Sequence, residues 1–501
     1  MNGDERSATR RAYLRAVGAT ATAGLLAGCG EFGTETTRET TETTARETPR
    51  EVGTAETTSR GDPERRETTT AELVEAADYG TVVNVADAGA DPTGGKPIDS
   101  ILDGRTGDDT LLYFPPGRYR LTEWRATGYR NLGVVGEDAA LVPPEGEQNY
   151  WLMWGDLRDF LFAGFTIDCR GENVAPITHL SVSGGTNVVR DVTVRGHRPA
   201  ATTALEVEAV APDATLRFEN LSMPDGSANG HAIYVYPESV GRLTFRNCRV
   251  EHWKEGLYAA YHSGPLRVIG GYYANNGIEQ VRVGGGTAGA LVRGVTVRVD
   301  NPRRPRNKPN MRGIWAEEGG FVRVENCDIA VTDLTGTYSS GGIVVGRQFG
   351  EAVVENTRIR TDTDAYALHV RNPIESMRGQ RIPSMESLPS RTRFTARNVR
   401  IVGTASDGTA VRANRRDDCR FENVCVRHPR GSRHGVSVAH SEGCSVRNST
   451  IDVTGEAIRS EDATVTTSGV RTDGSCSRGR GLFFRCERNH FVSQSTPEVS
   501  L

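Results

Sequence analysis

The sequence predicts an all-β protein that folds as a parallel β-solenoid of about twelve coils. Three observations support this prediction: a recurring pattern, one position in it that is restricted to three residue types, and a second strand pattern that precedes it. The pattern is clearest in "VRVENCDI" (322–329), "AVVENTRI" (352–359), "CRFENVCV" (419–426) and "CSVRNSTI" (444–451). Such repetition is typical of solenoids, in which one coil cannot bury its own apolar face but a stack of coils can.

The position on which the units align holds Asn, Gly or Asp throughout. These residues tolerate a positive φ angle, so the position marks a sharp bend in the main chain. Apolar residues four and two places before the bend alternate as in a half-buried strand, and another apolar residue follows three places after it. We expect the stacked Asn side chains to form a hydrogen-bonded ladder along the core. The predicted bends are Gly136, Gly164, Asp191, Asn220, Asn247, Gly270, Gly294, Asn326, Asn356, Asn398, Asn423 and Asn448.

A second strand precedes the bend by 12–14 residues in most units. Its alternation predicts two inward apolar residues per coil, and about 25 residues with two or three short strands form one coil, stacked about 4.8 Å from the next. The inward pairs are Ile233/Val235, Leu257/Ala259, Val281/Val283, Ile314/Ala316, Ile343/Val345, Leu368/Val370, Val411/Ala413 and Val436/Val438.

Residues 1–29 are predicted to be an export signal. Arg10 and Arg11 precede an apolar run, Ala16 to Ala27, that is too short to span a bilayer, and the arrangement resembles a twin-arginine signal. The run leads into "LAGC" (26–29), which resembles a lipobox with Cys29 as the lipidated residue. The alternative is a coincidental basic, Ala-rich start. The resemblance implies export and a lipid anchor at the outer face of the cell membrane.

Composition separates the remaining segments and excludes one class of partner. Residues 30–70 are rich in Thr, Glu and Arg and nearly lack large apolar residues, which predicts a disordered linker. We assign 71–475 to the solenoid and 476–501 to a C-terminal cap or tail. The net charge of −4 provides no basic surface for nucleic acid.

The start of the solenoid region resembles a known superfamily. "VNVADAGADPTGG" (83–95) and "YFPPGRY" (113–119) are similar to the N-terminal motifs of right-handed parallel β-helix proteins of the pectate-lyase-like superfamily. The helix that usually lies between the motifs is shortened to "KPIDSILDG" (96–104). The resemblance covers about residues 80–470 and implies a right-handed β-helix, but this scaffold carries many functions.

The cysteines suggest two disulfides. Cys419 and Cys444 occupy equivalent inward positions in adjacent coils, so they are expected either to pair or to stack as buried thiols. Cys476 and Cys486 bracket "SRGRGLFFR" and could close the C-terminal cap. No cysteine or histidine spacing indicates a zinc site, and no metal or other cofactor is expected, although a Ca²⁺ ion without an evident ligand cluster is conceivable.

Residues between the inward pairs face outward and form columns, one residue per coil. Arg282, Glu317, His369 and Arg371 are the candidate catalytic residues, and the candidate substrate-binding residues are Tyr234, Tyr236, Tyr258 and Trp315. Aromatic rings offer flat faces to sugars and Arg forks match carboxylates, but the same residue types also pack on ordinary β-surfaces. Glu255 and Glu279, at strand entrances, are equally compatible with surface charge. Insertions at 301–311 and 372–393 could wall a groove.

These residues favour binding, and potentially cleavage, of an extracellular acidic polysaccharide by a lyase-like β-elimination. Hydrolysis is less expected, because Glu317 has no carboxylate mate on the columns at the separation that glycosidases need. A β-elimination needs a base, such as His369 or Tyr258, and a cation, such as Arg282 or Arg371. The alternative is a non-catalytic surface protein that binds glycans, adheres, or has a structural role in the cell envelope. The expected partners are a glycan and, through the lipid anchor, the membrane.

Overall fold

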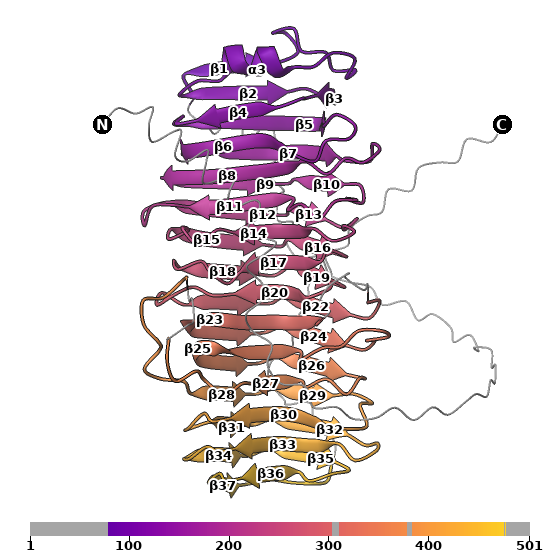
Figure 1. The fold of residues 1–501 in the computed structure, drawn as a ribbon, viewed down its shortest axis with the longest axis vertical. Helices are drawn as coiled ribbons and strands as arrows, with labels where there is room; N and C mark the ends of the chain where they lie inside the picture. Colours follow the sequence, from indigo (N-terminus) through magenta and orange to yellow (C-terminus); the bar gives the residue numbers. More distant parts are fainter. Residues whose placement is uncertain (1–78, 303–309, 378–382, 475, 477–501) are drawn as a thin grey trace, which may run out of the picture. The chain divides into compact units, whose positions relative to one another are not determined.

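The computed structural model describes residues 79–302, 310–377, 383–474 and 476, and within them the chain forms a right-handed parallel β-helix of about 13 turns. The strands stack in sequence order from β1 to β37 (Figure 1). Every pairing between described strands is parallel and joins one coil to the next. Each full coil contributes a strand to three faces in the order A, B, C. The described residues contain a single helix, α3 (Asp99–Arg105), which lies beside the first coil, in the region where the sequence indicated a shortened helix.

Face A contains the second strand of each predicted unit. Its strands are β4 (Trp124–Thr127), β6 (Tyr150–Arg158), β8 (Ile177–Gly184), β11 (Leu205–Ala209), β14 (His231–Val235), β17 (Glu255–Ala259), β20 (Glu279–Val283), the start of β23 (Arg312–Glu325), the start of β25 (Ile343–Glu355), β27 (Leu368–Val370), β30 (Thr409–Asn414), β33 (His434–Ala439) and β36 (Ile458–Glu461). The predicted inward pairs on this face are all buried, as the alternation requires.

Face B contains the strand that precedes the bend. It is formed by β1 (Thr81–Asn84), β2 (Thr110–Phe114), β5 (Leu132–Val142), β7 (Leu161–Asp168), β9 (Thr186–Arg190), β12 (Thr215–Glu219), β15 (Arg242–Arg246), β18 (Leu266–Ile269), β21 (Ala290–Arg293), the ends of β23 and β25, β28 (Phe394–Arg397), β31 (Arg420–Glu422), β34 (Cys444–Arg447) and β37 (Val465–Ser468).

Face C follows the bend and closes the coil. It is formed by β3 (Gly117–Arg120), the ends of β5 and β7, β10 (Thr193–Arg195), β13 (Ser222–Met223), β16 (Arg249–Glu251), β19 (Tyr272–Ala274), β22 (Thr296–Val299), β24 (Asp328–Val331), β26 (Arg358–Thr361), β29 (Arg400–Val402), β32 (Cys425–His428) and β35 (Thr450–Val453).

The predicted bends separate face B from face C. Eleven of the twelve have a positive φ angle, from 48° at Asn448 to 79° at Gly164. The prediction for Gly136 is wrong, because this glycine lies inside β5 without a positive φ and the left-handed residue of that coil is Asp138, with φ of 44°. The bend needs only one such residue, and Asp meets the requirement two places later.

The Asn ladder exists, but it lies on the outside of the solenoid and not along the core. Asn398 Nδ2 donates to Asn356 Oδ1 at 3.0 Å, and Asn423 Nδ2 donates to Asn398 Oδ1 at 2.7 Å. Asn398 and Asn423 are exposed, because the bend turns their side chains toward solvent while Val399 and Val424 point inward.

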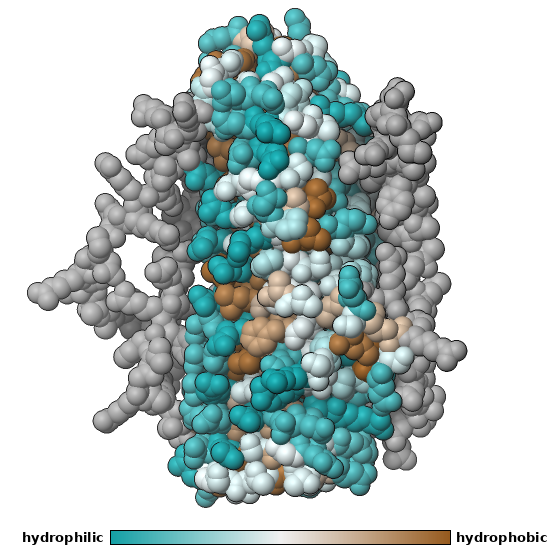
Figure 2. Space-filling model, turned by 90° about the vertical axis from the view of Figure 1, so that its left-hand side faces the viewer, coloured by the Kyte–Doolittle hydropathy of each residue, from teal (hydrophilic) through white to brown (hydrophobic). Residues whose placement is uncertain are grey.

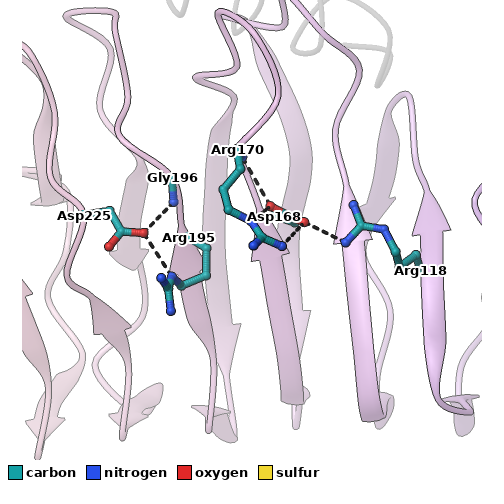
Figure 3. A network of polar contacts seen from close by, with 6 residues as sticks. All are labelled: Arg118, Asp168, Arg170, Arg195, Gly196 and Asp225. Carbon is teal, nitrogen blue, oxygen red and sulfur yellow. Dashed lines mark hydrogen bonds and ion pairs between the residues drawn. The ribbon is translucent and has the colours of Figure 1, made fainter. Parts of the chain in front are cut away.

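Polar contacts also join different coils on face C. The buried Asp168 carboxylate accepts hydrogen bonds from Arg118, which lies two coils earlier, and from Arg170, at 2.7–2.8 Å (Figure 3). Arg195 lies one coil beyond Asp168, and its Nε donates to Asp225 of the following coil, which also accepts from the backbone nitrogen of Gly196. The hydrogen bonds from Arg170 and Arg118 outweigh burial and lower the pKa of Asp168, so this carboxylate stays ionised.

The cysteines form one disulfide that the sequence did not indicate. Cys425, at the start of β32, is bonded to Cys476, with the two Cα atoms 5.7 Å apart. Of the two alternatives for Cys419 and Cys444, the structure shows the second: both are buried free thiols, and both sulfurs lie within hydrogen-bonding distance of the Arg416 carbonyl. The predicted pairing of Cys476 with Cys486 is wrong, since Cys476 is already bonded. Cys486, the predicted signal with Cys29, and the predicted linker lie outside the described residues.

The surface outside the core is mainly hydrophilic. Figure 2 shows one side of the solenoid on which hydrophobic residues gather in separate patches about midway along the stack. Among the described residues, Val82 and Tyr338 are the large hydrophobic side chains with more than half of their surface exposed. No helix in this part of the chain is long and apolar enough to cross a membrane.

Candidate functional site

The outward residues of face A form the column that the alternation predicts. Successive strands pair Tyr234 with Tyr258, Tyr258 with Arg282, Arg282 with Trp315, Trp315 with Val344, Val344 with His369, and His369 with Arg412. The column also continues toward the N-terminus through Glu206 and His179. Three groups of polar and aromatic side chains lie along this column.

The Arg282 cluster occupies the middle coils. The Arg282 guanidinium lies 3.8 Å from the ring centre of Tyr258 and 4.0 Å from that of Trp315, so an aromatic ring from each neighbouring coil packs against it. Its Nε donates to Glu317. Arg282 is 4% exposed, and such burial of a guanidinium requires this charge pairing and ring stacking.

Glu255 and Glu279 complete the Arg282 cluster, and they are buried rather than surface charges. Arg282 Nη1 lies 3.7 Å from Glu255 Oε2 and 3.8 Å from Glu279 Oε1. Burial and the neighbouring Glu255 raise the pKa of Glu279 well above its usual range. Burial alone would also raise the pKa of Glu255, but the nearby charges of His231 and Arg282 outweigh burial and lower this pKa. Their pKa values are therefore shifted in opposite directions, upward at Glu279 and downward at Glu255.

The His179 cluster lies on the N-terminal side of the Arg282 cluster. Tyr150 and Tyr236 both donate to Glu206 Oε2, at 3.0 and 2.8 Å. His179 lies between two carboxylates, with Nδ1 3.7 Å from Glu206 and Nε2 3.5 Å from Glu208. Burial opposes a charge on this imidazole, but Glu206 and Glu208 outweigh burial and raise the pKa of His179 to about 9. The His179 cluster thus carries an imidazolium at neutral pH.

The tyrosines connect the two clusters. The Tyr234 ring makes edge contacts with Tyr258 at 5.0 Å and with Tyr236 at 5.2 Å between ring centres. The predicted substrate-binding tyrosines are therefore neighbours, as the column implied. Tyr258 is only 3% exposed, so its ring packs on Arg282 and offers little surface to a ligand.

The His369 patch lies on the C-terminal side and forms one chain of contacts. Arg312 packs over Trp315 at 3.9 Å and donates from Nε to Ser340 Oγ at 3.1 Å. The Ser340 carbonyl lies 2.9 Å from His369 Nδ1, and the His369 ring lies 4.5 Å from that of Tyr366. We define the patch as Arg312, Trp315, Tyr338, Tyr366, His369 and Arg412, the last of which donates to the Tyr366 hydroxyl at 3.1 Å.

The electrostatics of the His369 patch keep the imidazole neutral. Burial, with the positive charges of Arg371, Arg412 and Arg312, lowers the pKa of His369 to about 4 despite its bond to Ser340. Since a carbonyl accepts only from an N–H, His369 Nδ1 carries the proton and Nε2 is the acceptor nitrogen. A neutral imidazole with an acceptor nitrogen and arginines nearby can take up a proton beside a bound anion.

The predicted catalytic residues fall into two places. Arg282 and Glu317 are in contact, but this pairing saturates Arg282 and leaves it poorly placed to neutralise a ligand. His369 lies two coils beyond Trp315, and Arg371 acts on it electrostatically. The four residues thus line a run of coils rather than converge on one point.

Sequence reasoning missed several members of the site. Extending the alternation through "ITHLSVS" and "ALEVEAV" would have placed His179, Glu206 and Glu208 on the same columns. No sequence pattern indicates Tyr338, because it lies in the loop between β24 and β25, where side chains do not alternate between inward and outward positions. Its backbone carbonyl accepts from Met311 N at 2.9 Å, which places the 54% exposed side chain beside the Trp315 strand.

The two insertions differ in what the structure describes. Most of the 301–311 insertion lies outside the described residues, whereas the second insertion is described except for 378–382. Ser384 N donates to Glu318 Oε1 at 2.9 Å, so this insertion covers the corner next to Glu317. Arg416 fixes both of its ends by donating to the carbonyls of Arg371 and Thr392.

In the part of the chain that the structure describes, no three His, Cys, Asp or Glu side chains are placed to hold a metal ion. The expectation that no metal is required stays a prediction.

Comparisons with known proteins give fold-level likeness only. No family model and no curated protein matches the chain. Among solved structures, the surface protein and adhesin PfbA of Streptococcus pneumoniae is 12% identical, with a TM-score of 0.44 over 78% of this chain and 100% of that one. The A-module of the Azotobacter vinelandii mannuronan C-5 epimerase AlgE6 is 15% identical, with a TM-score of 0.31 over 79% and 100%. The catalytic domain of a GH87 α-1,3-glucanase is 14% identical, with a TM-score of 0.30 over 82% of this chain and 70% of that one.

Proposed function

We propose that this protein binds an acidic polysaccharide across the His369 patch of face A. The observation that carries the proposal is the continuous chain of contacts from Trp315 through Arg312, Ser340, His369 and Tyr366 to Arg412. It combines rings that can stack on sugars with guanidinium groups that can pair with carboxylates. Tyr338, another member of the patch, has a side chain that is 54% exposed.

The charges along face A favour an acidic ligand on the C-terminal side of Trp315. Glu206, Glu208 and Glu255 lie on the N-terminal side of Trp315, where they would repel a polyanion. Arg312, Arg371 and Arg412 all act on His369 on the other side. A uronate chain would therefore be drawn to the C-terminal half of face A.

The direct test is binding to a panel of uronate-containing and neutral polysaccharides. Affinity electrophoresis of the purified protein should show retention by the acidic polymers that weakens with added salt. Retention by none of them, or equal retention by neutral polymers, would reject the proposal. The result would then favour an adhesive or structural role in the cell envelope.

A second candidate function is cleavage of the bound uronate by β-elimination. His369 favours it, because its neutral form presents Nε2 as an acceptor. In this reaction His369 takes the proton α to the uronate carboxylate, whose charge is balanced by Arg371 or Arg412. The electron pair forms a carbon–carbon double bond while the glycosidic carbon–oxygen bond breaks, and the leaving oxygen takes a proton from Tyr366 or water. Ultraviolet absorbance of unsaturated products in the wild type, and its loss in His369→Ala with binding retained, would separate cleavage from binding.

We also propose that the protein acts outside the cell, held by a lipid on Cys29. The proposal rests on the twin-arginine-like and lipobox-like residues of the N-terminus. Fractionation after lysine replacement of Arg10 and Arg11, and lipid labelling of Cys29→Ser, test the two parts separately. Labelling that persists without Cys29 would contradict the anchor.

A further inference from the structure

The interior of the solenoid contains a cavity bordered by a buried cation. The cavity has a volume of about 40 Å³ and is lined by residues of three successive coils, including Trp154, Phe162, Leu180 and Leu221. Its wall is almost entirely apolar, and Arg198 is the charged residue among those that line it. The volume exceeds the roughly 10–15 Å³ that one water-sized ligand needs.

Arg198 has no compensating charge among the described residues. It is 1% exposed, and its Nη2 donates over 3.2 and 3.4 Å to the Thr202 hydroxyl and the Thr203 carbonyl, which are neutral acceptors. The ionisable group that acts on it is the Cys169 thiol, which is also hydrogen-bonded to it, and the guanidinium carbon lies 5.9 Å from the centre of the Trp253 ring. Burial raises the pKa of Cys169 to about 11, so this thiol is neutral at physiological pH. An isolated buried charge is costly, which calls for a counter-ion.

Two hydrogen-bond donors that border this cavity lack acceptors. Arg198 Nε and Trp154 Nε1 are both buried, and neither has a hydrogen-bond partner in the described part of the chain. Both residues line the cavity. Buried donors are normally satisfied, so two unsatisfied N–H groups and a cation around one space indicate a missing acceptor that carries negative charge.

We propose that this cavity binds a small monovalent anion of the halide class, with chloride as the physiological occupant, between Arg198 and Trp154. A halide fits because it is compact, accepts hydrogen bonds from several directions and is polarisable enough to lie against apolar walls. Water fits less well, since it would add two donors to a space that already has an excess of them. The site is separate from face A and does not depend on the polysaccharide proposal.

The first test is thermal unfolding of the purified protein in sodium chloride and in sodium gluconate at equal ionic strength. Binding to the native state should raise the melting temperature by about 3 °C at 100-fold saturation for a chain of this length. Arg198→Met should abolish the difference between the two salts. Arg416→Met is the matched control: it removes another buried arginine, one already satisfied by backbone carbonyls, and should preserve the difference.

The second test uses iodide and does not depend on the stability of an Arg198 variant. Trp154 is 2% exposed, so collisional quenching cannot reach it, whereas an iodide in the cavity would quench its fluorescence saturably. Chloride should compete for this quenching, and Trp154→Phe should remove it. A strictly linear quenching curve together with a melting temperature that is equal in chloride and gluconate would overturn the proposal.

Discussion

Arg282 shows how a buried charge on face A is stabilised by the side chains around it. Its guanidinium contacts two rings and lies beside three glutamates, one from its own coil and one from each neighbouring coil. The column of Tyr258, Arg282 and Trp315 was predictable, because alternation fixes which residues face outward. The ion pairs of Arg282 with Glu255 and Glu279 could not be predicted. Whether these side chains reach Arg282 depends on their conformations, which the alternation of residues along a strand does not determine.

Removal of Arg282 should be far more damaging than removal of an exposed arginine. Arg282→Met leaves buried carboxylates without a partner, and we expect it to lower the free energy of unfolding by about 3–5 kcal/mol. Arg293→Met is the control: Arg293 pairs with Glu325 but is 51% exposed, so about 1 kcal/mol or less is expected. Chemical denaturation of both variants measures the difference, and equal losses would contradict the assigned role of Arg282.

His179 should make the free energy of unfolding fall as the pH rises into the alkaline range. Its folded pKa of about 9 lies above the unfolded value of about 6.5. Its contribution is therefore fully present below pH 6.5 and is lost as the pH rises through 9. The wild type should lose more stability than His179→Gln between pH 6.5 and 9, measured by denaturation at several pH values. Parallel pH profiles would mean that His179 is not held as a cation.

At the scale of one structural element, the bend between faces B and C combines a backbone requirement with an external ladder. The restriction to Asn, Gly or Asp revealed the left-handed backbone, because few other residues tolerate it. The sequence could not separate Gly136 from Asp138, since both types are permitted and the two lie in one coil. Nor could it show that the ladder faces solvent, because that depends on the direction in which the bend projects its side chains.

Two substitutions of Asn398 separate these contributions. Asn398→Gly keeps the backbone freedom but removes the ladder bonds to Asn356 and Asn423, and should cost about 1 kcal/mol. Asn398→Ala also places an ordinary side chain at a φ of 54°, which should add about 1–2 kcal/mol. Thermal denaturation compares the two variants. An alanine variant as stable as the glycine variant would show that the left-handed backbone does not set the residue type.

At the scale of the whole described solenoid, stability accumulates from coil to coil and is weakest where stacking ends. Parallel pairing gives every inner coil two neighbours, while β36 and β37 each have one. The stacking itself was predictable from the repeat. The Cys425–Cys476 closure was not, because Cys425 belongs to a coil that the cysteine spacing did not link to the C-terminus.

Loss of this disulfide should loosen the last coils selectively. Because the bond joins residues 51 positions apart, we expect its removal to cost about 2–4 kcal/mol in the coils that it encloses. In Cys425→Ser and Cys476→Ser, amide hydrogen exchange should accelerate in β36 and β37 while β14 and β17 stay protected. Protection of β36 and β37 unchanged in both variants would argue against the bond.

The measurement that tests the central claim most directly is the affinity for an acidic polysaccharide of two arginine variants from the same coil. Arg412 lies in the His369 patch on face A, and Arg420 is exposed on face B. Since both substitutions by alanine remove one positive charge, they change the net charge equally. We predict that Arg412→Ala binds about tenfold more weakly than the wild type while Arg420→Ala binds as the wild type does. Equal weakening by the two variants would contradict a binding site on face A and indicate attraction by overall charge.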